Sequence, residues 1–228
     1  MGERNVEFTS PITSKKARLL STRVVSDLVR RWRSEFGLEI HQEFNQTKLV
    51  YHLKCLDTGL EFFRPVDIAG SANLYRQLSK FDWYYMSDKW EFEVATSMLK
   101  RDFKVLEVGC GRGAFLTKCR DLGIAAEGLE LNEFAAGLAQ KDGLKVMTRS
   151  LEELSQDGVK FDAICAFQVL EHDPEPGRFL NSLCSILVSG GLLILSVPNK
   201  DVLAKVNAPE NLLGECKKFC VTSSINMG

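Results

Sequence analysis

Histidine and net charge are both scarce in this chain of 228 residues, which has three histidines and a formal net charge of −1. A balanced chain has no overall attraction to nucleic acid or to an anionic membrane. Long apolar runs are also missing, and Leu192–Val197 is far too short to span a bilayer. The polar start MGERNVEFTSPITSKK has no apolar core of a signal peptide. We therefore expect a cytoplasmic protein without a nucleic-acid partner or a membrane span.

Regularly spaced cysteines are absent as well. The seven cysteines are odd in number, and no C-x-x-C pair occurs. A disulfide framework or a zinc site is therefore not expected, and we predict no metal site. We expect buried free thiols in a reducing compartment at Cys110, Cys119, Cys165 and Cys184.

The hydrophobic share of 45% and the charged share of 26% are those of a globular protein with a real core. We expect a small α+β subdomain over residues 1–100. Leu20, Val24 and Leu28 recur at helical spacing, which predicts a helix over Ser14–Phe36.

A hairpin and two further helices are predicted next. Two short β-prone runs flank Asp57–Gly59 and indicate the hairpin, and the helices are expected over Asn73–Lys80 and Lys89–Lys100. Between these helices lies FDWYYMSDKWEF (Phe81–Phe92), the most aromatic segment of the chain. Its rings suit either core packing or a lid over a ligand. Both interpretations stay open, and the residues that could close such a lid are Tyr84, Tyr85 and Trp90.

From Phe103 onward, short apolar runs alternate with helical patterns. This rhythm predicts a Rossmann-like, doubly wound α/β fold with a mainly parallel sheet, in a core domain over residues 101–200. Parallel strands covered on both faces are apolar throughout, as these runs are.

A glycine turn follows the first of these strands, in VLEVGCGRGAF. Gly109, Gly111 and Gly113 let the backbone approach a ligand closely, and their N–H groups can act as donors together with the start of the next helix. About twenty residues later Glu130 ends the next strand, where a carboxylate can accept hydrogen bonds from a ribose diol. The pair predicts a nucleoside-containing cofactor.

Glu107 decides between two cofactor classes. A carboxylate on the first strand would repel the pyrophosphate of a nicotinamide dinucleotide, whose fingerprint also places the third glycine one position later, at Ala114. The same carboxylate suits S-adenosylmethionine, which has a sulfonium and an α-ammonium and no phosphate.

These residues carry a resemblance. The run E-x-G-x-G-x-G at Glu107–Gly113 resembles the first motif of class I S-adenosylmethionine-dependent methyltransferases, and GLELN resembles their acidic strand end. FDAICAFQVLEHDPEPGRFL (Phe161–Leu180) and GGLLILSVPN resemble their fourth and fifth strands, in a form similar to the ubiquinone-biosynthesis O-methyltransferases. The resemblance covers about Phe103–Asn199.

The resemblance implies S-adenosylmethionine as cofactor and assigns roles around it. Glu107 would orient the glycine loop near the methionine end, Glu130 would hold the ribose hydroxyls, and Leu131 would lie against the adenine. The remaining implied contacts are Gly109, Cys110, Gly111 and Gly113 along the methionine and ribose, Ser150, Leu151 and Glu152 at the adenine edge, and Phe167 and Gln168 at the methionyl group.

His172 is the candidate general base. An oxygen or nitrogen nucleophile must lose a proton during methyl transfer, and His172 follows the fourth strand directly. A structural role in the loop before Pro174 stays open, and Glu171 is expected to be structural.

The tail departs from the family pattern. A complete class I fold adds two more strands, and residues 201–228 do not resemble them. We expect strands six and seven to be missing and the open sheet edge to be covered by the N-terminal part, a partner or another copy. The predicted function is methyl transfer to an oxygen or nitrogen of a small molecule; the alternatives are a non-catalytic cofactor-binding module and a nicotinamide-dependent oxidoreductase.

Overall fold

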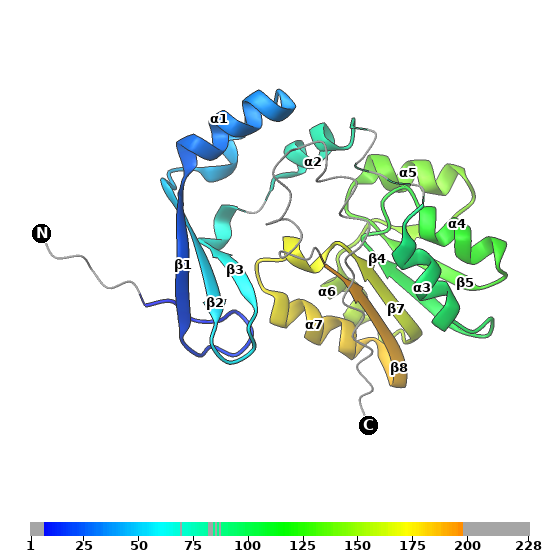
Figure 1. Ribbon diagram of the computed structural model, residues 1–228. Coiled ribbons are helices and arrows are strands. Elements are labelled where there is room, and N and C mark those ends of the chain that lie inside the picture. Colours follow the sequence, from blue (N-terminus) through cyan, green and yellow to red (C-terminus); the bar gives the residue numbers. More distant parts are fainter. Residues whose placement is uncertain (1–6, 69, 82–83, 85, 87, 198–228) are drawn as a thin grey trace, which may run out of the picture. The chain divides into compact units, whose positions relative to one another are not determined.

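The computed structural model describes residues 7–68, 70–81, 84, 86 and 88–197 (Figure 1). The chain divides into two compact units, residues 1–77 with 174–177 and residues 78–173 with 178–228. We call them the N-terminal unit and the parallel-sheet unit. The boundaries predicted from the sequence rhythm, 1–100, 101–200 and 201–228, stay a prediction, and the last of these segments lies outside the described residues.

The N-terminal unit contains a three-stranded antiparallel sheet in the order β1-β2-β3. The strands are β1 (Ala17–Val24), β2 (Leu49–Cys55) and β3 (Glu61–Arg64). β2 and β3 form the hairpin that the Asp57–Gly59 turn predicted. Buried residues of all three strands make a small core: Ala17, Leu53, Cys55 and Phe62.

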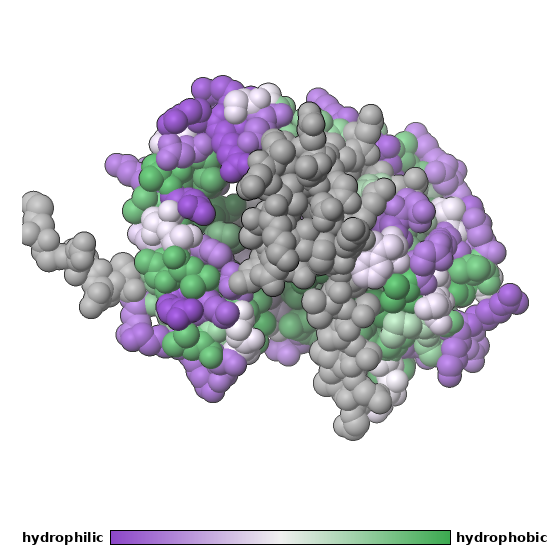
Figure 2. All heavy atoms as spheres, viewed as in Figure 1, coloured by the Kyte–Doolittle hydropathy of each residue, from purple (hydrophilic) through white to green (hydrophobic). Residues whose placement is uncertain are grey.

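The helix predicted over Ser14–Phe36 is wrong in its first half. Residues Ala17–Val24 form strand β1, and helix α1 covers only Val25–Phe36. The apolar spacing of this segment fits both structures, and pairing decides between them, because β1 pairs with β2 from Ala17 to Val24 with one irregularity at Leu20. Gly37 ends α1 in the left-handed conformation (φ 65°), where a residue without a side chain is favoured. Figure 2 shows that hydrophilic residues cover the visible side of α1.

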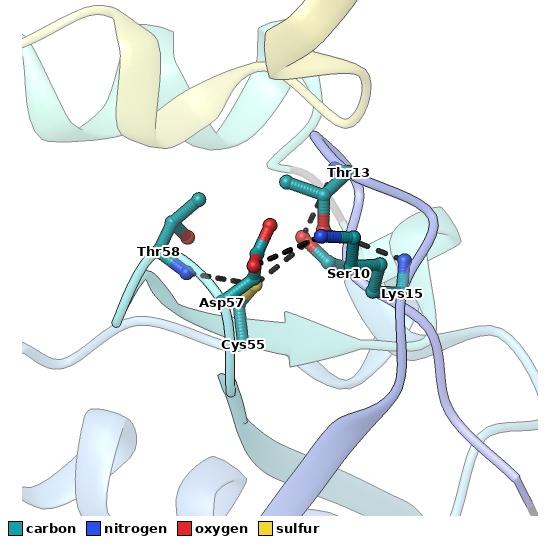
Figure 3. Close-up of polar contacts among 6 residues, drawn as sticks. All are labelled: Ser10, Thr13, Lys15, Cys55, Asp57 and Thr58. Carbon is teal, nitrogen blue, oxygen red and sulfur yellow. Dashed lines mark hydrogen bonds and ion pairs between the residues drawn. The ribbon is translucent and has the colours of Figure 1, made fainter.

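The segment before β1 is fastened to the hairpin turn (Figure 3). The Cys55 sulfur accepts a hydrogen bond from the Thr58 N–H at 3.4 Å and lies 3.6 Å from the Thr13 hydroxyl. The Lys15 ammonium forms an ion pair with Asp57 at 3.0 Å. Side-chain contacts, rather than strand pairing, therefore hold the segment before β1 against the hairpin turn.

Short helices complete the first part of the chain. They are η1 (His41–Phe44), η2 (Val66–Ile68), α2 (Ala72–Leu78) and α3 (Trp90–Met98). α2 and α3 confirm the two helices predicted around the aromatic segment, each slightly shorter than expected.

The parallel-sheet unit has five strands in the order β6-β5-β4-β7-β8, and every neighbouring pair is parallel. This confirms the predicted Rossmann-like fold. The bounds are β4 (Lys104–Val108), β5 (Ala125–Leu129), β6 (Val146–Met147), β7 (Phe161–Phe167) and β8 (Leu187–Ser196).

Helices cover both faces of this sheet (Figure 1). α3 and α4 pack on one face through Phe92, Phe115 and Cys119, whereas α6 and α7 pack on the other through Leu154 and Leu183. The sheet therefore has a core on each side, as a buried parallel sheet requires. The bounds are α4 (Ala114–Asp121), α5 (Glu133–Lys141), α6 (Leu151–Gln156), η3 (Leu170–His172) and α7 (Pro176–Ser185).

The buried-thiol prediction holds for three of the four cysteines. Cys110, Cys119 and Cys165 are free and buried, whereas Cys184 is partly exposed. Cys184 follows the buried Leu183 on α7, and because consecutive helical residues point in different directions, the burial of Leu183 leaves Cys184 nearer the helix surface.

β8 is an edge strand among the described residues. The expected absence of two further strands concerns the tail, which lies outside those residues, so a partner at this edge stays a prediction. None of the helices in the described ranges has the length and apolar character that a membrane crossing requires.

Candidate functional site

The candidate site lies where β4, β5 and β7 end. Because these strands are parallel neighbours, the segments that follow them meet at one edge of the sheet. The glycine turn follows β4, Glu130 follows β5 and Gln168 follows β7. From β4 the strand order runs through β5 to β6 at one edge of the sheet, and through β7 to β8 at the other edge. The order therefore reverses at β4, and ligands bind at such a switch point.

The glycine turn needs its glycines for conformation and for space. Gly109, Gly111 and Gly113 have φ angles of 73°, 54° and 80°. A Cβ atom on Gly109 would lie 2.5 Å from a Val169 methyl, and one on Gly113 would lie 2.4 Å from a Leu144 methyl. The backbone therefore packs against other side chains more closely than any other residue type allows.

The N–H groups of the turn are engaged within the protein. The N–H groups of Gly109 and Cys110 both donate to the Leu129 carbonyl, at 2.8 and 3.0 Å, and that of Gly113 donates to the Cys110 carbonyl at 2.9 Å. These groups hold the turn against the end of β5. The expectation that the Gly109 and Gly113 N–H groups act as ligand donors is therefore corrected, whereas the part that concerns the start of α4 stays a prediction.

Glu130 joins two segments of the site. One carboxylate oxygen accepts the Gly111 N–H at 2.8 Å, and the other accepts the Asn132 N–H at 2.7 Å. Asn132 in turn caps α5 by accepting from the N–H groups of Phe134 and Ala135. Each carboxylate oxygen keeps a second acceptor position for a ligand hydroxyl.

Glu107 is buried at the end of β4, with 3% of its surface exposed. Its Oε2 atom has no hydrogen-bond partner among the described residues. Burial raises the pKa of Glu107 to about 8; Lys89 opposes this rise, and the Glu130 charge adds to it. A buried carboxyl group without a partner is costly, and a cation beside it would relieve that cost.

Lys89 is a site residue that sequence reasoning missed. It directly precedes α3, and its charge acts on both Glu107 and Glu171.

The structure describes two of the three residues of the predicted lid. Trp90 begins α3, and its ring N–H is buried without an acceptor among the described residues. Tyr84 is partly exposed, and Tyr85 lies outside the described residues. Closure of these rings over a ligand stays a prediction.

The end of β7 is held by ring packing at Phe167 and by hydrogen bonds at Gln168. The Phe167 ring packs against Phe92 and Phe115, at centroid distances of 5.1 and 4.9 Å, so only its backbone can face a ligand. Gln168 has a φ of 58°, which costs a residue with a side chain about 1–3 kcal/mol. Its N–H and side-chain amide both donate to Ser196, at 2.9 and 3.3 Å, and these bonds hold it there.

His172 ends η3, with its side chain 52% exposed. Partial burial lowers the pKa of His172, which favours the neutral imidazole at neutral pH. Glu171 lies 4.0 Å away, and burial raises the pKa of this carboxyl group to about 7. A neutral, accessible imidazole can accept a proton.

The remaining predicted contacts differ in what they can offer. Leu131 is 72% exposed and keeps an apolar surface available. Ser150 forms a capping box with Glu153, so its hydroxyl is occupied by the start of α6. Leu151 belongs to the core, so only its backbone can contact a ligand, whereas Glu152 is partly exposed in the first turn.

Comparison with known proteins places the chain in a family. A family model described as a methyltransferase domain matches residues 75–222. The chain belongs to the methyltransferase domain family. This confirms the class I methyltransferase prediction, whose cofactor is S-adenosylmethionine, and it removes the support for a nicotinamide-dependent oxidoreductase.

Curated relatives of this methyltransferase domain include two bacterial proteins named ubiquinone biosynthesis O-methyltransferase. That of Caulobacter sp. (strain K31) is 31% identical over 116 residues, which are 46% of this chain and 46% of the relative. That of Coxiella burnetii (strain RSA 493 / Nine Mile phase I) is 28% identical over 106 residues, 44% of this chain and 45% of the relative. The match thus spans slightly less than half of each relative.

Among solved structures, a methyltransferase from Archaeoglobus fulgidus, described as SAM dependent, is similar to 63% of this chain. The similarity covers 74% of that protein, with 23% identity and a TM-score of 0.49.

The crowding at the glycine turn yields a stability prediction. Gly113→Ala should destabilise the chain more than Gly123→Ala, although both glycines have similar positive φ angles of 80° and 73°. Around Gly123 a Cβ atom meets nothing within 4 Å, whereas at Gly113 it meets Leu144. We expect a difference of about 1–3 kcal/mol in unfolding free energy from urea titration, since overpacking is added to the same backbone strain. Equal losses would contradict the crowding.

Proposed function

We propose that this chain transfers a methyl group from S-adenosylmethionine to an oxygen or nitrogen atom of a small-molecule acceptor. The observation that carries the proposal is the Glu107 carboxyl group, which is buried at the end of the central strand and has no partner for Oε2 among the described residues. A buried acid there favours a cationic ligand over a phosphate.

The residues at the strand ends fit this cofactor. Glu107 offers an acceptor to an ammonium group, and Glu130 offers free acceptor positions to the two ribose hydroxyls. The exposed Leu131 offers an apolar surface to the adenine. The other proposed contacts are Gly109, Cys110, Gly111, Gly113, Ser150, Leu151, Glu152, Phe167 and Gln168.

When bound, the cofactor supplies an electrophilic methyl group on a sulfonium. The contribution of the chain is mainly positioning, because a well-oriented pair of reactants reaches effective molarities of roughly 10⁵ M or more. Hydrogen bonds within the protein hold the glycine turn and Gln168 in position for that purpose. His172 takes the proton that the acceptor hydroxyl or amine loses, and its lowered pKa keeps it ready to do so.

Three further points belong to the proposal. The acceptor is a small molecule, as the bacterial relatives' names support by analogy. The location is cytoplasmic, because the described cysteines are free thiols. A partner or a second copy covers the outer edge of β8.

A non-catalytic cofactor-binding module is the remaining alternative, because the match covers less than half of the relatives. Formation of S-adenosylhomocysteine in a screen of phenol and amine acceptors, with catechol as the first probe, separates the two. Cofactor binding without product formation across the screen would favour the module.

Glu130→Ala should weaken S-adenosylmethionine binding at least tenfold, or about 1.4 kcal/mol, because charge-assisted bonds to the ribose are lost. Calorimetric titration measures the change. Glu133→Ala is the matched control, since Glu133 lies on the exposed side of the first turn of α5. An unchanged affinity of Glu130→Ala would remove Glu130 from the site.

Cofactor binding should release about one proton near pH 7. In the free protein, burial raises the pKa of Glu107 to about 8, so the carboxyl group is protonated at pH 7. A bound cation lowers that pKa. At a pH between the pKa of the bound protein and that of the free protein, Glu107 therefore loses its proton when the cofactor binds. Calorimetry in two buffers of different ionisation enthalpy measures the release.

Glu107→Gln should abolish the proton release, whereas Glu133→Gln, at an exposed position of α5 outside the proposed contacts, should leave it unchanged. A binding heat that does not depend on the buffer in the unmutated chain would contradict the assignment of Glu107 to the cationic end of the cofactor.

His172→Ala should lower the turnover number by about 10²-fold or more and leave cofactor affinity unchanged. The rate of the unmutated chain should rise with pH through a value below 6.5, because burial lowers the pKa of the base. His41→Ala, in η1 of the N-terminal unit, is the matched control. A parallel loss of turnover and cofactor affinity would indicate a structural role for His172.

A further inference from the structure

A groove on the N-terminal unit is lined by residues that have no role in the proposed methyl transfer. It is a shallow groove, largely open to solvent, with a volume of about 510 Å³. Its lining comes from the start of the described chain, the segment before β2, β2 itself and the end of β3: Phe8, Gln46, Thr47, Lys48, Leu49, Tyr51, Arg64 and Pro65. It shares no residue with the site at the ends of β4, β5 and β7.

Two aromatic rings form an apolar part of the groove. The Phe8 and Tyr51 rings lie 5.1 Å apart between centroids, at an angle of 47°. Both side chains are only partly buried, so part of their surface faces the groove. Rings placed in this way offer faces and edges to a flat ligand.

The charges in the groove are all positive. Lys48 and Arg64 line it, and none of the lining residues is acidic. Among the described residues neither cation has an aspartate or glutamate within ion-pair distance. Other basic residues of the same unit do have one, such as Arg31 with Glu35.

Arg64 is the more informative of the two cations. It is partly buried; its guanidinium lies 4.9 Å from the Phe62 ring centroid and donates one hydrogen bond to the Phe63 carbonyl at 3.1 Å. Burial lowers the pKa of Arg64, which reflects the cost of a partly desolvated charge. The guanidinium has five donors, and those left over suit the two oxygens of a carboxylate.

We propose that this groove is a second ligand site that binds a small aromatic carboxylate, with its ring against Phe8 and Tyr51 and its carboxylate toward Lys48 and Arg64. The rings recognise the flat body, and the two cations recognise the charge. An inorganic anion alone would leave most of the groove unfilled. The proposal is independent of the methyl-transfer function.

The test uses the full chain and 2-naphthoate as the probe. A fluorescence titration measures the binding. Saturable binding of 2-naphthoate is expected, with affinities for neutral 2-naphthamide and for inorganic phosphate each about tenfold weaker or more, because each lacks one of the two recognised features. Phosphate that binds as tightly as 2-naphthoate would overturn the aromatic part of the proposal, and equal binding of 2-naphthamide would overturn the anionic part.

Variants locate the binding. Arg64→Gln and Lys48→Gln should each weaken 2-naphthoate binding severalfold, whereas Arg18→Gln, an exposed β1 residue outside the groove, should not. If Arg64→Gln fails to fold by circular dichroism, the exposed Lys48→Gln decides. Glu130→Ala should leave 2-naphthoate binding unchanged, which separates this site from the cofactor site. Absence of saturation at about 10 mM, or an affinity in both groove variants that equals that of the unmutated chain, would overturn the site.

Discussion

The hydrogen bond from the Gly111 N–H to the Glu130 carboxylate is the contact on which the candidate site depends. It ties the turn after β4 to the end of β5, and the second oxygen of Glu130 fixes the Asn132 N–H at the start of α5. One side chain therefore sets the position of the glycine turn and the entry to two helices. The same carboxylate keeps acceptor capacity for a ligand, so the binding role that we propose for Glu130 adds to its structural one.

The order of strands and helices in the parallel-sheet unit was predictable because its signals are local. Apolar runs, helical spacing and glycines at the turns act over a few residues, and each strand is buried on both faces. The N-terminal unit was harder to predict. Residues Ala17–Val24 have a spacing that fits a helix, and only pairing with the distant β2 makes them a strand. The periodicity of the sequence does not reveal which distant strand pairs with these residues.

The candidate site was predictable in its chemistry and less so in its geometry. The acids Glu107 and Glu130 were identified from their positions at strand ends, and the structure places both beside the glycine turn. The sequence did not reveal that the N–H groups of the turn are already bonded to the Leu129 carbonyl. It also did not reveal Lys89, because the approach of α3 to the end of β4 is a tertiary effect.

The pairing of β4 with two neighbours has a consequence for the order of folding. Glu107 lies opposite Gly128 in β5 and opposite Cys165 in β7, so the second pairing closes a loop more than twice as long. The longer loop costs about 1 kcal/mol more in chain entropy. Contacts close in sequence form faster, so we expect the glycine turn and Glu130 to come together before Gln168 and His172. The part of the candidate site around the glycine turn and Glu130 is thus expected to form first, and the part around Gln168 and His172 is expected to be added to it.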